Sequence, residues 1–282
     1  MHTFKRSLLR LATCSLLLLP IVCNALAAPS SASVSVSPLE AAGKLRSLAQ
    51  RQAKLYLQLR LGVEREASER WLAEAVRSFD ENLAVVTRAA QGDSSTTRIV
   101  GRITTQWEGL RLTLSSPLET SKAQGIAADA EQIAIAAQAL ALRFDLAQES
   151  PMYRLVDLAS RNDMLAQRLA RIYMQIRAGQ GGKAAEVDVE QTRKEFAAGL
   201  KELAGASDNT PAIKANLELA RQQWLFFEMA VNDRVKSSEN LRRDVATTSE
   251  RISQMMNEAS LVYVQMAGRA SEPPLAQNGR KR

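Results

Sequence analysis

The sequence AGKLRSLAQRQAKLYLQLRLG at residues 42–62 returns 117 residues later as ASRNDMLAQRLARIYMQIRAG at residues 159–179. Ten of the 21 aligned positions are identical, and no gap is needed. The same offset aligns Trp107 with Trp224. Because one register holds over all these positions, the sequence predicts two copies of one structural unit. An internal repeat of this kind predicts the architecture more directly than any single motif does.

Gly, Pro, Asp and Ser breakers divide each copy into four helical stretches. No segment shows the sustained alternation of apolar and polar residues that marks a strand. The predicted fold class is therefore all-α, with two tandem up-down four-helix bundle modules at residues 39–149 and 150–270. The predicted helices cover about 39–61, 65–90, 96–115 and 120–148 in the first copy, and 151–179, 184–204, a stretch from 211, and the residues before the C-terminal tail in the second.

The N-terminus has the three parts of a secretory signal peptide. Lys5, Arg6 and Arg10 are followed by an apolar run at residues 8–22, and Ala25-Leu26-Ala27 fits the small-x-small cleavage pattern. We expect residues 1–27 to be a cleaved signal peptide, which for a bacterial chain means a periplasmic protein. Residues 28–38 and the basic tail at 271–282 are predicted to be flexible ends.

Composition excludes most catalytic chemistry. The one His and both Cys lie within the first 23 residues, so a cleaved chain has no Ser-His-Asp or Cys-His site, no His or Cys metal site and no disulfide. No Gly-rich phosphate loop is present, and we predict no enzyme activity, no metal and no cofactor. Cleavage leaves 34 basic and 30 acidic residues, and this near balance does not favour nucleic-acid binding.

Arg46 stands out on a helical wheel of residues 39–61. Leu, Ala and Tyr side chains fill one broad arc and polar side chains fill the other, but Arg46 projects between Ala53 and Leu57 at the margin of the apolar arc. A buried guanidinium needs a polar partner. A carboxylate, a carbonyl or a bound anion would serve, and the plainer interpretation is an arginine that snorkels or meets an internal acid.

The string AGKLRSLAQRQAK at residues 42–54 resembles the signature helix of the sensor domain of type IV pilus methyl-accepting chemotaxis transducers (PilJ-type). It is also similar to the corresponding helix of nitrate/nitrite sensor kinases (NarX-type), approximately A-G-x-x-R-M-L-S-Q-R-x-A-K. Residues 159–171, ASRNDMLAQRLAR, match as a second copy. The resemblance implies a periplasmic four-helix ligand-binding module.

In the nitrate-sensing branch, the two arginines of this motif contribute to binding a small oxyanion between equivalent helices of a dimer. The resemblance therefore implies nitrate or nitrite as the candidate ligand of Arg46 and Arg51, assisted by Gln50. The two arginines lie about 140° apart on one helix, so they cannot both point at one anion from a single helix. A second chain or another pairing geometry is required, and the shared site predicts a homodimer through residues 39–61.

The second copy departs from this pattern. Its equivalent positions hold Asp163, Gln167 and Arg168. A carboxylate at position 163 would repel an anion, which makes the second copy the weaker candidate site. The exchange also suggests an alternative: if the two first helices pack about an internal two-fold axis, Arg46 would face Asp163 and the pair would neutralise itself.

Two functions remain open from the sequence. The leading hypothesis is a periplasmic sensor or binding protein for nitrate or nitrite, which passes its signal by docking to a membrane-bound sensor or another envelope protein. The alternative is a ligand-free helical interaction or scaffold module for a pilus, chemosensory or envelope complex.

Overall fold

The helices follow the breakers in the sequence. The computed structural model describes residues 36–119, 121–147, 150–232 and 239–270. These residues contain no strand, which confirms the predicted all-α fold. Their eight helices are α1 (Pro38–Arg60), α2 (Arg65–Ala89), α3 (Ser94–Leu114), α4 (Lys122–Leu146), α5 (Met152–Arg177), α6 (Lys183–Ala204), α7 (Pro211–Asn232) and α8 (Glu239–Ala270).

The ends of the chain lie outside this description. The predicted signal peptide at 1–27, residues 28–35 of the predicted N-terminal segment and the predicted tail at 271–282 are not among the described residues. Within the described ranges, a search for membrane-spanning helices finds none with the necessary length and apolar character.

Local sequence sets the ends of the two central helices. At the start of α1, the Ser37 hydroxyl accepts a hydrogen bond from the Glu40 backbone N–H at 3.1 Å, which satisfies a donor that the helix itself cannot. Gly62 and Gly179 follow α1 and α5 at equivalent repeat positions and have φ of 69° and 77°. Glycine adopts this left-handed backbone without a steric penalty, so it terminates both helices in the same way.

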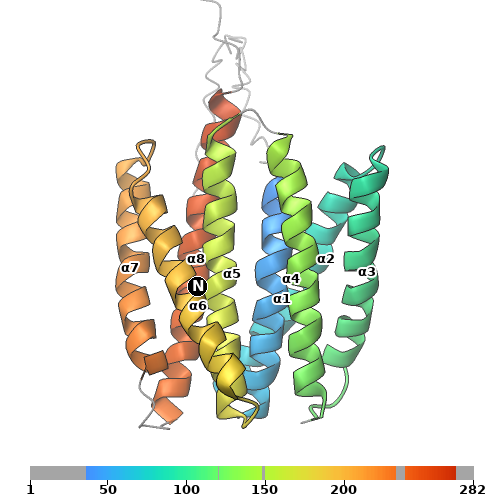
Figure 1. Cartoon of the computed structure of the whole chain (residues 1–282), viewed down its shortest axis with the longest axis vertical. Coiled ribbons are helices and arrows are strands. Elements are labelled where there is room, and N and C mark those ends of the chain that lie inside the picture. Colours follow the sequence, from blue (N-terminus) through green and yellow to red (C-terminus); the bar gives the residue numbers. More distant parts are fainter. Residues whose placement is uncertain (1–35, 120, 148–149, 233–238, 271–282) are drawn as a thin grey trace, which may run out of the picture. The chain divides into compact units, whose positions relative to one another are not determined.

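Helices α1 and α5 lie at the centre of the packing, because each contacts helices of its own repeat and the two also contact each other (Figure 1). Within the first repeat, α1 packs on α2 and α4, and α3 closes the ring between them; in the second repeat, α5 packs on α6 and α8, and α7 lies between those two. The contact between α1 and α5 joins the rings, and all eight helices belong to one compact unit. The predicted module boundary lies between residues 149 and 150, next to residues 148–149, which are outside the described part of the chain.

Equivalent residues of the two repeats meet where α1 crosses α5. Gly43 and Ser160 differ by the repeat offset, and a Cβ atom placed on Gly43 would lie 2.6 Å from the Ser160 Cβ. The helices therefore pack parallel and in register, about an approximate two-fold axis near this residue pair. A second sign of the symmetry is a stacked aromatic pair in each repeat, Phe79 on Trp107 and Phe196 on Trp224.

A methyl group at position 43 tests this crossing. We expect Gly43→Ala to lower the free energy of unfolding by about 1–3 kcal/mol, because overpacking a close contact outweighs the gain in helix propensity. Gly101→Ala is the matched control, since Gly101 lies inside α3 with open space around it; there alanine should stabilise by about 0.5–1 kcal/mol. Urea denaturation of both variants measures the two effects, and a stabilised Gly43→Ala variant would contradict the close packing.

Candidate functional site

The polar arc of α1 is buried rather than solvated. Gln50, Lys54 and Gln58 are fully buried, and Arg46 is only 1% exposed. The side chains of Arg46, Gln50 and Lys54 reach acids and amides on α4, α5 and α8, so α1 carries an apolar core on one side and a polar core on the other. A buried charge costs several kcal/mol unless it is paired and hydrogen-bonded, which makes the partners of these groups decisive.

Arg46 is bound by the second repeat. Its Nη2 donates to the Asp157 carboxylate at 2.8 Å and lies 3.4 Å from the Asp157 carbonyl oxygen, and its Nη1 donates to Gln138 on α4. Burial lowers the pKa of Arg46, and the Asp157 charge opposes that shift. The structure thus pairs Arg46 with Asp157, one and a half turns earlier on α5, and not with Asp163.

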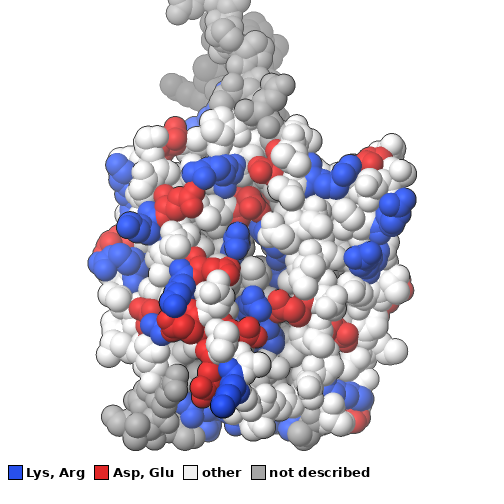
Figure 2. Space-filling model, viewed as in Figure 1, with Lys and Arg blue, Asp and Glu red and all other residues white. Residues whose placement is uncertain are grey.

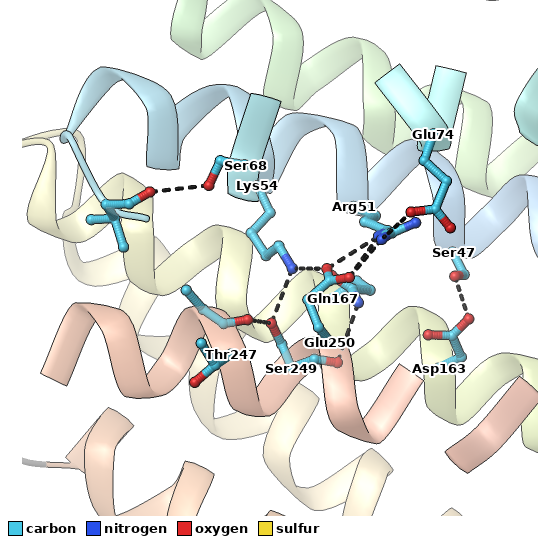
Figure 3. A network of polar contacts seen from close by, with 12 residues as sticks. Ser47, Arg51, Lys54, Ser68, Glu74, Asp163, Gln167, Thr247, Ser249 and Glu250 are labelled. Atoms are coloured by element: carbon cyan, nitrogen blue, oxygen red, sulfur yellow. Dashed lines mark hydrogen bonds and ion pairs between the residues drawn. The ribbon is translucent and has the colours of Figure 1, made fainter. Parts of the chain in front are cut away.

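Asp163 has a different environment. Its carboxylate accepts a hydrogen bond from the Ser47 hydroxyl of α1 (Figure 3), and its other oxygen, Oδ1, is buried without a hydrogen bond within the described structure. Burial raises the pKa of Asp163, while hydroxyl groups of Ser253 and Ser47 and the Arg51 charge partly offset the rise. Its burial therefore disfavours the charged form of Asp163.

Arg51 is held by α8. Glu250 accepts bidentate hydrogen bonds from Arg51, with Nη2 2.6 Å from Oε2 and Nε 3.1 Å from Oε1, and also accepts from Lys54 Nζ at 2.5 Å (Figure 3). Burial alone would raise the pKa of Glu250, but Lys54 and Arg51 outweigh it and lower the pKa to about 2. This arrangement ties the first repeat to α8 of the second repeat through a charge-assisted network.

A related cluster lies between α1, α4 and α5. Arg171, the repeat equivalent of Lys54, donates to Gln50 at 2.7 Å and to Glu131 at 3.2 Å. Glu131 also accepts from Gln50 at 3.2 Å and pairs with Arg168 at 3.4 Å. Burial lowers the pKa of Arg171 to about 10, opposed by the Glu131 charge.

The six residues singled out from the sequence are thus divided among separate contacts. Gln50 and Arg168 meet at Glu131, whereas Arg46 and Arg51 bind acids on different helices and do not converge. Gln167 is fully buried and donates to the Ser249 carbonyl oxygen at 3.3 Å.

The sequence analysis missed the other half of the network. Lys54 and Arg171 are central to it, and their basic character at one repeat position was a usable signal. Glu131 and Glu250 carried no such signal, because their equivalent positions hold Thr248 and Ile133, whereas Asp157 corresponds to the acid Glu40 but lies outside the aligned motif.

A polar cleft opens beside this network between α2 and α8. It has a volume of about 610 Å³, and Arg51, Trp71, Glu74, Glu250 and Asn257 line part of it. A smaller neighbouring hollow of 170 Å³ reaches Asp163. Among the residues with a described placement, no group of His, Cys, Asp and Glu side chains is arranged to hold a metal ion.

Comparisons with family models, curated proteins and solved structures give no match for this chain. The resemblance to PilJ-type and NarX-type sensor domains therefore stays a prediction from the helix motif and its repeat.

Replacement by asparagine should change the free energy of unfolding in opposite directions at two aspartates of α5. Asp163→Asn is expected to raise the free energy of unfolding at pH 7, because it removes a carboxylate whose pKa burial raises. The sign follows from linkage: the ionised acid destabilises the folded state above its ordinary pKa of 3.8, so the difference from the parent chain should vanish below that pH.

Asp157→Asn is the matched control. It leaves Arg46 buried without its counter-charge and should lower the free energy of unfolding by about 3 kcal/mol. Urea denaturation between pH 3 and 8 gives both values. A less stable Asp163→Asn variant at pH 7 would mean that a cation compensates the Asp163 charge.

Proposed function

We propose that this chain is an exported helical interaction module, which docks on a membrane-bound sensor or another envelope protein. One observation carries the choice over an oxyanion sensor: Arg46, the residue best placed by sequence to hold an anion, is already bound at 2.8 Å by Asp157 of the second repeat. One carboxylate oxygen and the backbone carbonyl oxygen of Asp157, with the amide oxygen of Gln138, accept the hydrogen bonds that the guanidinium would otherwise donate to nitrate or nitrite.

The pairing of α1 with α5 supports the same interpretation. In the family that the motif resembles, the anion lies between equivalent helices of two chains. Here one chain supplies both equivalent helices, and the polar groups between them include acids for Arg46, Arg51 and Arg168. An added anion would have to displace a carboxylate that is tethered at the site, which disfavours it.

An apolar surface on α7 offers a place for a partner. Leu225, Phe226 and Met229 are 47%, 63% and 70% exposed. Their equivalents on α3 are Glu108, Gly109 and Leu112, so the first repeat has one exposed apolar side chain where α7 has three. Exposed apolar groups clustered on one helix mark contact surfaces more often than isolated ones do. On the face drawn in Figure 2, by contrast, basic and acidic side chains are intermixed.

Small oxyanions should leave the parent chain unchanged. We expect nitrate, nitrite, sulfate, phosphate and chloride at equal ionic strength to give the same unfolding midpoint, because no anion gains the Arg46 site. Asp157→Asn should have a lower midpoint in chloride and regain part of it in nitrate or nitrite, since Arg46 then lacks its counter-charge and a small oxyanion bound near it stabilises by mass action.

Differential scanning fluorimetry with each salt makes the comparison. A nitrate- or nitrite-selective rise in the parent chain, larger than the rise in Asp157→Asn, would favour the sensor hypothesis over the interaction module.

A partner should contact α7 and not α3. With a photoreactive amino acid at Phe226, irradiation of intact cells is expected to join the chain to one defined envelope protein. The same amino acid at Gly109, the equivalent position on α3, is the control and should give no such product. Mass spectrometry identifies the product, and equal products from both positions, or none from Phe226, would argue against this contact surface.

A further inference from the structure

The two stacked aromatic pairs have the same geometry but different surroundings. Phe79 and Trp107 have ring centroids 4.1 Å apart at an interplanar angle of 27°, and Phe196 and Trp224 have centroids 4.1 Å apart at 25°. In the first repeat, Trp107 Nε1 donates to an Asp80 oxygen at 2.7 Å. The indole N–H there has an acceptor from its own chain, as buried indoles usually do.

The second repeat lacks that acceptor. The residue equivalent to Asp80 is Ala197. Trp224 is only 5% exposed, and its indole N–H makes no hydrogen bond to any residue in the described ranges. Trp224 and Ala197 border one space, at the repeat positions where Trp107 and the Asp80 carboxylate meet in the first repeat.

That space is a groove between α6 and α7. It has a volume of about 380 Å³ and is bordered by both Ala197 and Trp224. Leu200, Ala204 and Leu217 contribute further apolar walls. Small-molecule sites typically have this size or more, with mainly apolar walls and a few polar groups that fix orientation.

The charges around the groove favour an anion. Lys201, Lys214 and Arg221 border it, with Glu218 as the acid. Arg221 holds Glu218 at 2.7 Å, so this acid is neutralised. Lys201 and Lys214 form no ion pair within the described part of the chain. Lys201 lies about one helical turn beyond Ala197, and Arg221 about one turn before Trp224.

We propose that the α6–α7 groove binds an alkyl carboxylate, such as a medium-chain fatty acid. Its carboxylate accepts the Trp224 indole N–H beside Ala197, in the place that Asp80 occupies in the first repeat, and its chain lies against Leu200 and Leu217. This site is separate from the α1–α5 interface and does not depend on the proposed interaction function.

Equilibrium dialysis of the full chain with radiolabelled decanoate, below its micelle concentration, tests the site. We expect saturable binding of one decanoate. Ala197→Asp introduces the carboxylate of the first repeat and should weaken binding at least tenfold without lowering the unfolding midpoint. Trp224→Phe removes the N–H donor and should weaken it about tenfold, whereas the control Trp107→Phe should not change it. Neutral decanol should bind at least tenfold more weakly than decanoate.

Three results would overturn the proposal. These are the absence of saturable decanoate binding, equal binding by the parent chain and Ala197→Asp, and equal binding of decanol and decanoate. Binding of an acidic peptide that Ala197→Asp abolishes, without any binding of decanoate, would instead identify the groove as a protein-docking surface. Because the readout is decanoate binding, a failure here leaves the α7 crosslinking result standing.

Discussion

The structure depends on the burial of charged groups between α1 and α5. Arg46 and Lys54 are almost completely buried. An unpaired charge at either position would destabilise the folded state by more than the surrounding apolar contacts stabilise it. Each cation is therefore matched by an acid from elsewhere in the chain, Asp157 for Arg46 and Glu250 for Lys54. The same bonds that neutralise the charges also fix the register of the two repeats.

The sequence predicts the helical fold, but only half of the residues that make the polar contacts around α1. The 117-residue offset, the glycines after α1 and α5, and the aligned Phe and Trp residues predict the helices and their repetition. A helical wheel also singles out Arg46. It cannot show which acid lies opposite, because Asp157 and Glu250 come from distant positions that only the packing of α5 and α8 brings near α1. Gly43 is similar: its role appears only where Ser160 crosses it.

The two repeats differ in the charged groups that they place at equivalent positions. Arg46 corresponds to Asp163, and Asp80 corresponds to Ala197. The first exchange replaces a basic side chain by an acidic one and the second removes an acid, while the stacked rings and the helix ends keep the same geometry. Two repeats with the same fold but different polar groups can therefore present different chemistry.

The tandem linkage has a consequence for how this interface behaves in dilute solution. When two separate chains pair through equivalent helices, the extent of pairing depends on their concentration. Here α1 and α5 are covalently joined, so their local concentration is set by the connecting chain and stays high however scarce the protein is. The paired arrangement is thus permanent, and changes in abundance cannot open or close it.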